Sequence, residues 1–234
     1  MNVLAITCHP DDAEINCVGT LLKCLKRGDN VTVCHVCNGN KGHEIIPSDE
    51  LRKIRAEEAQ KAGRIGNFRV VTCDIPDLEI YRCNEDYRKR VVDVIRDVQP
   101  DFIITHAPND YMPDHVAVSQ LVFDASFAAS CMYFESNVPG KAGVTPIYYM
   151  DNLAGVGTMP TMYVDISDEI DLKMEMLECH ESQLVWMRDH DGIDFADFVK
   201  TCSKYRGLQC GVPYAEAYTE CYSWPKVTTK RLLP

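Results

Sequence analysis

The 234-residue chain lacks any apolar stretch near the roughly 20 residues that a membrane-spanning helix needs. Its first residues, Met1–Asp12, have neither the basic start nor the longer apolar run of a secretory signal. Repeats, low-complexity tracts and linkers are also absent. We therefore expect a cytoplasmic protein with a single domain over residues 1–234, although the length alone would also allow two small domains.

An excess of positive charge is missing as well. The 35 Asp and Glu residues outnumber the 24 Lys and Arg residues, which gives a formal net charge of −11. We expect no nucleic acid and no membrane among the partners of such a chain. A local basic pocket for an acidic substrate remains compatible with this total. The share of hydrophobic residues, 46%, is typical of a globular protein and excludes a disordered one.

Cysteine is abundant, but a repeated zinc-binding pattern is missing. Among the 12 cysteines, Cys34 and Cys37 have the spacing of a redox or zinc motif. No second pair of this kind follows. Both residues also lie in a segment with the pattern of a buried strand, on which residues three apart point to opposite faces. We therefore expect the cysteines to be reduced, mostly buried thiols with a structural role.

The hydrophobic pattern alternates between strands and helices over most of the chain. The predicted strands are Asn2–Thr7, Asn30–Cys37, Phe68–Cys73, Phe102–His106, Pro146–Met150 and Met162–Asp165. The predicted helices are Glu14–Arg27, Ser48–Gly63, Asp86–Val98, His115–Ala129 and Asp168–Glu181. This order predicts an α/β fold with a doubly wound, mostly parallel sheet and helices on both faces. Residues 184–234 give no clear pattern, so we expect an irregular C-terminal part.

Chemically distinctive residues follow the first predicted strand. His9, Asp11 and Asp12 stand between this strand and the first helix, at the edge of the sheet where open α/β folds bind ligands. One carboxylate at this position could simply cap the helix, but capping does not explain the adjacent histidine. Three ionisable groups within four residues would repel or desolvate one another unless a cation collects them.

A second segment of this kind follows the fourth predicted strand and contains Asp110, Asp114 and His115. In the common strand order 3-2-1-4, strands one and four are neighbours that flank the ligand-binding crevice. The two loops are therefore expected to meet. A nicotinamide cofactor is not expected in this crevice, because the turn after strand one lacks a glycine-rich phosphate loop.

Mixed imidazole and carboxylate ligands are typical of a catalytic zinc ion, and we assign His9, Asp12 and His115 to it. Other divalent metals, such as iron, nickel or cobalt, suit the same ligands. Zinc would lower the pKa of water toward ~7 and polarise a substrate carbonyl. Asp11 is then predicted to accept a proton from the water. Asp114 is predicted to orient an imidazole ligand by contacting the ring nitrogen that does not bind the metal.

These residues resemble the paired signature of the PIG-L/LmbE-like N-acetylglucosaminyl deacetylase family. The similarity spans most of the chain and is carried by His9-Pro10-Asp11-Asp12, Asn38-Gly39, Arg52–Ala62, Asp101–Ser119, His180-Glu181-Ser182-Gln183 and Tyr214-Ala215-Glu216. It implies a Rossmann-like fold and zinc-dependent removal of an N-acetyl group from a small glucosamine-containing or related amino-sugar substrate. It also implies that Arg55 contacts the substrate and that the protein is a homo-oligomer, a trimer or hexamer.

One position departs from the family pattern. The family often has a histidine where this chain has Met112, and a thioether cannot donate a proton to the oxyanion or the leaving amine. Loss of one oxyanion donor typically costs about 100- to 1000-fold in rate. The candidates to replace it are Tyr111, His106 and His180. His106 is equally compatible with a strand-end histidine that bonds to the backbone.

The remaining histidines carry weaker predictions. His43 lies in the loop after the second strand and is predicted to reach the substrate at the mouth of the site, although exposed loop histidines are common. His35 is expected in the core or on a sheet face, and His190 in a polar turn. Because of Met112, two alternatives to deacetylation stay open. These are a metal-dependent hydrolase of a non-sugar amide or ester, and a non-catalytic ligand-binding protein that retains its metal.

Overall fold

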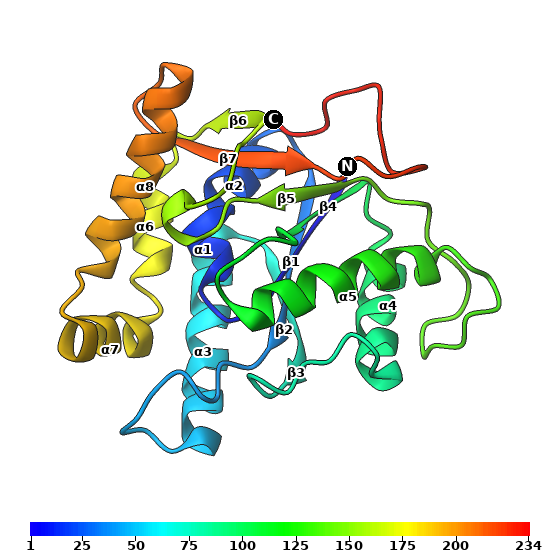
Figure 1. The fold of residues 1–234 in the computed structure, drawn as a ribbon, viewed down its shortest axis with the longest axis horizontal. Coiled ribbons are helices and arrows are strands. Elements are labelled where there is room, and N and C mark those ends of the chain that lie inside the picture. Colours follow the sequence, from blue (N-terminus) through cyan, green and yellow to red (C-terminus); the bar gives the residue numbers. More distant parts are fainter.

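The sheet of this protein has seven strands in the order β3-β2-β1-β4-β5-β7-β6 in a computed structural model that describes all 234 residues (Figure 1). The first five strands in this order are parallel, and β7 runs antiparallel to both β5 and β6. The strands are β1 Asn2–Thr7, β2 Asn30–Cys37, β3 Arg69–Ile75, β4 Phe102–His106, β5 Ile147–Met150, β6 Met162–Asp165 and β7 Ala215–Glu220. The predicted order 3-2-1-4 and the mostly parallel α/β sheet are confirmed.

Helices cover both faces of the sheet. They are α1 Asp12–Asn16, α2 Val18–Lys26, α3 Ser48–Gly66, α4 Glu85–Val98, α5 Pro113–Ala129, α6 Ile170–Leu177, α7 Glu181–Asp191 and α8 Phe195–Cys210. Alternate residues of β1 serve the two faces. Leu4 and Ile6 belong to the core cluster with α4 and α5, whereas Val3 and Ala5 belong to the cluster with α1, α2 and α6. A strand apolar on both faces therefore forms the centre of the molecule.

The predicted helix Glu14–Arg27 is divided in two. Cys17 leaves the helical conformation, with φ −146° and ψ −4°, between α1 and α2. The carboxylate of Glu216 accepts hydrogen bonds from the backbone N–H groups of Gly19 and Thr20, at 2.9 and 2.8 Å. A carboxylate is favourable at a helix N-terminus because it satisfies free N–H groups there. The break therefore depends on a residue almost 200 positions away, which the local pattern does not reveal.

The prediction of an irregular C-terminal part is wrong for residues 184–220, and only residues 221–234 contain no helix or strand. Most of α7, all of α8 and all of β7 lie within residues 184–234, and the three helices α6, α7 and α8 gather at the left of Figure 1. The predicted helix Asp168–Glu181 is also corrected. It ends at Leu177, and His180 lies at the start of α7 instead of within a helix.

The prediction for the two spaced cysteines is partly wrong. Cys34 and Cys37 are both fully buried free thiols, as expected. However, the pairing of β2 with β3 shifts register between His35 and Cys37. An irregularity of this kind changes the side toward which the next side chain points. Cys37 therefore packs in the same core cluster as Cys34. None of the helices combines the length and the apolar composition that a membrane span requires.

Candidate metal centre and active site

The loops after β1 and β4 meet at one edge of the sheet, as the strand order predicts. β1 and β4 pair in parallel, with Ile6 opposite Thr105, so both chains leave the sheet side by side. A cavity of about 220 Å³ opens at this edge. Its lining includes six residues singled out from the sequence, namely His9, Asp11, Asp12, Arg55, Tyr111 and His115, together with Met112.

Asp12 lies between the two histidines of the predicted ligand set. Its Oδ1 atom is 3.3 Å from His115 Nε2, and its Oδ2 atom is 3.5 Å from His9 Nδ1. Two donors bound to tetrahedral zinc at about 2.0–2.1 Å are about 3.3 Å apart. All three side chains are buried, and they come from the two converging loops. The donor types and the spacing of these residues thus fit a divalent metal ion.

Further aspartates stand behind both imidazoles. His115 Nδ1 is 3.2 Å from Asp110 Oδ1, and His9 Nε2 is 3.3 Å from Asp114 Oδ2. Asp114 also accepts a hydrogen bond of 2.9 Å from the N–H of Leu78. A carboxylate on the second ring nitrogen fixes the orientation of a histidine ligand. Asp110 was not assigned this role from the sequence, although its place two residues before Met112 in a polar strand-end loop is a signal for it.

Carboxylates also control the charge of these histidines. Burial lowers the pKa of His115, but Asp12 and Asp110 outweigh this effect and raise it to about 9. For Asp12, burial raises the pKa of the carboxyl, while His115 and His106 hold it well below its usual range. A cluster that attracts protons so strongly also attracts a divalent cation.

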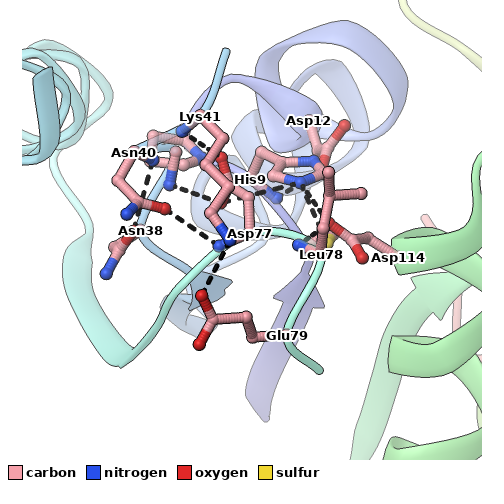
Figure 2. A network of polar contacts seen from close by, with 12 residues as sticks. His9, Asp12, Asn38, Asn40, Lys41, Asp77, Leu78, Glu79 and Asp114 are labelled. Carbon is pink, nitrogen blue, oxygen red and sulfur yellow. Dashed lines mark hydrogen bonds and ion pairs between the residues drawn. The ribbon is translucent and has the colours of Figure 1, made fainter. Parts of the chain in front are cut away.

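Asp77, after β3, is a buried member of the site that the sequence reasoning missed. Its Oδ1 accepts the N–H of Gly39 at 2.8 Å, and its Oδ2 accepts the N–H of Lys41 at 3.0 Å. The same carboxylate lies 3.9 Å from His9 Nε2. In Figure 2, Asp77 and Asp114 accordingly lie on either side of the His9 network. Asp77 therefore links the loop after β2 to the metal-site histidine. Its signal in the sequence is only an acidic residue shortly after a third parallel strand.

Asp11, the predicted base, has a strained backbone. Its φ is 120° and its ψ is −28°, a conformation that costs a non-glycine residue about 1–3 kcal/mol. The Asp11 carboxylate is 3.0 Å from Arg55 Nη2 and faces the cavity. Burial raises the pKa of Asp11 to about 6, although the Arg55 charge opposes this shift. The surroundings thus hold an acidic group in a position and environment that suit proton transfer.

Arg55 contacts the loop after β1 and the loop after β2 at the cavity. Its Nη2 donates to the carbonyl of Pro10, at 2.5 Å, and its Nη1 donates to the carbonyl of Gly39, at 3.3 Å. Gly39 has φ +75°, and a Cβ atom there would lie 2.7 Å from the Arg55 side chain. Glycine is therefore required at this position for two reasons, its positive φ and the close approach of the arginine.

The segment His180-Glu181-Ser182-Gln183, which resembles the family pattern, holds α7 against α3. Glu58 accepts two hydrogen bonds from Ser182, from its N–H at 2.8 Å and from its hydroxyl at 2.7 Å. This contact places Gln183 and Met187 of α7 in the wall of the cavity. His180 is itself fully buried, 3.3 Å from Glu14, and does not line the cavity.

The candidate proton donors lie in different places. His106 is buried beneath the site, and its Nε2 accepts the N–H of Cys8 at 2.9 Å. Burial and the neighbouring His115 lower the pKa of His106 to about 4. Tyr111 lines the cavity, is 63% exposed and packs edge-on against His115 with ring centroids 5.9 Å apart. Met112 lines the cavity from the start of α5.

His43, the second predicted substrate contact, lies away from the cavity lining. Its ring is 4.8 Å from Trp186 of α7, and its Nδ1 accepts the N–H groups of Ile45 and Ile46. Trp186 in turn stacks on His190. His43 therefore joins the loop after β2 to α7. His35 is buried, 3.0 Å from the hydroxyl of Thr7, as expected of a core histidine.

The chain is similar to several known proteins. Residues 4–126 match the family described as PIG-L, GlcNAc-PI de-N-acetylase. Diacetylchitobiose deacetylase of Thermococcus kodakarensis is 30% identical over 228 residues, which cover 92% of this chain and 80% of that protein. The 4-oxalmesaconate hydratase of Pseudomonas putida is 25% identical over 78% of this chain and 74% of its own length.

A similar solved structure is that of the 4-carboxy-2-hydroxymuconate hydratase of Pseudomonas putida. It superimposes with a TM-score of 0.82 over 99% of this chain and 100% of that chain, at 22% identity. The family match covers more than half of the chain and includes both metal-site loops. This protein therefore belongs to the PIG-L, or GlcNAc-PI de-N-acetylase, family.

Proposed function

We propose that this protein is a zinc-dependent hydrolase that removes an N-acetyl group from an amino-sugar-like small molecule. The observation that carries the proposal is the convergence of His9, Asp12 and His115 beside a cavity that Asp11 also lines. The diacetylchitobiose deacetylase relative supports the choice of substrate class. We further infer a homo-oligomer, as the family resemblance implies, and a cytoplasmic location.

Amide hydrolysis needs a base, a stabilised oxyanion and a proton for the leaving nitrogen. His9, Asp12 and His115 would hold a divalent metal ion, which would supply a Lewis acid to acidify water and polarise the carbonyl. Asp11 accepts the proton of the attacking water, because it is the one cavity-lining carboxylate of the first loop that is not a ligand. Its contact with Arg55 holds it in place.

The proton that the leaving amine needs is assigned to Tyr111. Its hydroxyl can donate a proton, as the missing histidine would. Tyr111 directly precedes Met112 and lines the cavity. Partial desolvation in the cavity wall and the nearby charges of Asp12, Asp110 and Asp11 raise the pKa of Tyr111, so the phenol stays protonated and able to donate. His106 and His180 are assigned supporting roles instead, because neither lines the cavity.

The rest of the cavity suits a polar, uncharged or weakly acidic ligand. Arg55, Lys41 and Gln183 reach its lining from three different segments and offer donors to hydroxyl and carbonyl oxygens. Leu153, Met187 and Phe195 supply an apolar wall of the kind that packs against the face of a sugar ring.

The test measures metal and activity together. The protein is stripped with a chelator, reloaded with zinc, and assayed for acetate release from diacetylchitobiose and other N-acetylglucosamine derivatives. We expect activity only in the loaded protein, with one metal ion bound per chain. If the protein binds no metal and releases no acetate, the proposed function is wrong.

Hydration of an unsaturated carboxylic acid is a second candidate. Met112 and the 25% identity to 4-oxalmesaconate hydratase favour it. Addition of water to a carbon–carbon double bond expels no amine, so the donor that Met112 lacks is not required for a leaving group. Loss of the ultraviolet absorbance of unsaturated dicarboxylates would identify this reaction. Release of acid from non-sugar amides or esters would identify the hydrolase alternative, and tight binding without turnover would identify a ligand-binding protein.

A further inference from the structure

Two cysteine thiols that the proposed reaction does not use lie directly behind the metal centre. Cys8 precedes His9 at the end of β1, and Cys37 ends the neighbouring strand β2. The two backbones touch, since the Cys37 N–H donates to the Cys8 carbonyl at 2.8 Å. Both thiols are fully buried, and neither forms a disulfide.

These thiols complete a second group of possible ligands with two residues of the first centre. One donor atom each from Cys8, Cys37, His9 and Asp114 lie within 4.8 Å of one another. Cys8 Sγ is 3.5 Å from His9 Nε2, which is 3.3 Å from Asp114 Oδ2. Tetrahedral zinc, with bonds of about 2.3 Å to sulfur and about 2.0 Å to nitrogen or oxygen, separates S from N by about 3.5 Å and N from O by about 3.3 Å. The four side chains therefore approach the geometry of a Cys₂-His-Asp site.

Cys8 and His9 also belong to a group with Asp12 and His115. His9 uses a different edge of its ring in each group. Its Nδ1 faces Asp12 at 3.5 Å, whereas its Nε2 faces Cys8 and Asp114. A neutral imidazole has one lone pair for a metal, because the other nitrogen carries the proton. A cation held at Nε2 leaves Nδ1 protonated and turned toward Asp12. The two groups therefore cannot both be filled through one neutral His9.

We propose that Cys8, Cys37, His9 and Asp114 form a second site for a thiophilic divalent cation, such as cadmium or excess zinc, which competes with the catalytic metal for His9. Thiolate ligands select soft cations, and the two thiol protons are released to water when the cation binds. The cation reaches the site through the cavity, which His9 lines. Binding does not require the proposed deacetylation; only the resulting inhibition rests on it.

Cadmium titration of the metal-free protein tests the site without an activity assay. The background is a variant in which the exposed cysteines Cys83, Cys131 and Cys210 are changed to serine, which removes adventitious thiols. With cadmium kept below one equivalent, we expect a thiolate-to-cadmium charge-transfer band in the ultraviolet. X-ray absorption at the cadmium edge should then give two sulfur neighbours, and this measurement needs no change in the buried core.

Substitutions at the site assign the band. Cys8→Ser and Cys37→Ser should each weaken the band and lower the cadmium affinity by more than about tenfold, the smallest loss expected when an important metal-site partner is removed. Cys34→Ser is the matched control, because Cys34 is equally buried on the same strand but lies beside Cys73. The thiolate-to-cadmium band of the Cys34→Ser variant should be unchanged. Circular dichroism checks that each variant is folded.

Changes in the catalytic group separate the two sites. Asp12→Ala and His115→Ala should abolish activity but keep the cadmium–thiolate band, since neither residue belongs to the second group. If the enzyme is inactive for an unrelated reason, the band is still expected. A wild-type complex without sulfur neighbours, or a full band in folded Cys8→Ser, Cys37→Ser protein, would overturn the inference.

Discussion

His115 and Asp110 form a pair in which Nδ1 of the imidazole lies 3.2 Å from a carboxylate oxygen. The opposite ring nitrogen of His115 lies 3.3 Å from Asp12. The Asp110 side chain is only 1% exposed, and it also accepts the N–H of Met112 at 3.0 Å. One aspartate thus fixes both the orientation of a metal-site histidine and the start of α5.

Replacement of Asp110 tests this arrangement. Asp110→Asn keeps the size of the side chain but removes its charge, so His115 becomes a weaker and less oriented ligand. We expect zinc affinity to fall by about 10- to 100-fold. Competition with a chromophoric chelator measures the affinity, and Asp101→Asn, an exposed change at the opposite end of β4, is the control. Unchanged zinc affinity in Asp110→Asn would contradict the proposed role.

Replacement of Asp11 tests the base. Asp11→Asn retains the shape of the residue, and asparagine tolerates positive φ, so the loop should fold. We expect kcat to fall by about 100- to 10,000-fold while one metal ion stays bound, because Asp11 is not a ligand in the proposed set. Metal analysis and acetate release are measured on the same sample. Full activity in this variant would show that another group accepts the proton.

Introduction of a histidine at position 112 tests the effect of the missing donor. If proton donation limits the rate, Met112→His should raise kcat by up to about 100-fold. This is the lower end of the change in kcat that one oxyanion donor typically causes. Met112→Leu, which has similar volume and no donor, should leave kcat unchanged. Tyr111→Phe should lower kcat if Tyr111 donates in the native protein. A Tyr111→Phe variant with unaltered kcat would remove Tyr111 from the mechanism.

Replacement of Lys173 tests what holds the first two helices in place. Its Nζ is fully buried and bonds to Glu216 Oε1 at 2.6 Å and to the carbonyl of Ile15 at 2.8 Å. Lys173→Met leaves the Glu216 charge buried without its partner, so we expect a loss of about 3–5 kcal/mol in the free energy of unfolding. Denaturant titration measures the loss. Lys204→Met, at an exposed position of α8, should change it by less than about 0.5 kcal/mol.

The strand order and the meeting of the two polar loops were predictable, because both follow from patterns along the chain. An apolar run such as Asn2–Thr7 predicts a central strand, and the residues after it then stand at a known edge of the sheet. The approach of His9, Asp12 and His115 follows from that placement alone.

The supporting residues were harder to predict because their partners are distant in sequence. Asp77 and Asp110 look like ordinary loop acids until the fold brings Gly39 and His115 to them. The break at Cys17 likewise depends on Glu216 of β7, and a charged residue is unusual in a buried strand. Such residues form polar contacts with partners far along the chain, and neither hydrophobic periodicity nor residue spacing predicts these contacts.

The hydrogen bonds between Glu216 and the start of α2 also affect the order in which parts of the protein can fold during translation. Gly19 leaves the ribosome early, but the carboxylate that completes its hydrogen bonding is 197 residues further along. The nascent chain therefore carries both loops of the candidate metal centre well before the junction of α1 and α2 can take its final form. Assembly of the catalytic edge is completed only when the last strand has been translated and inserted between β5 and β6.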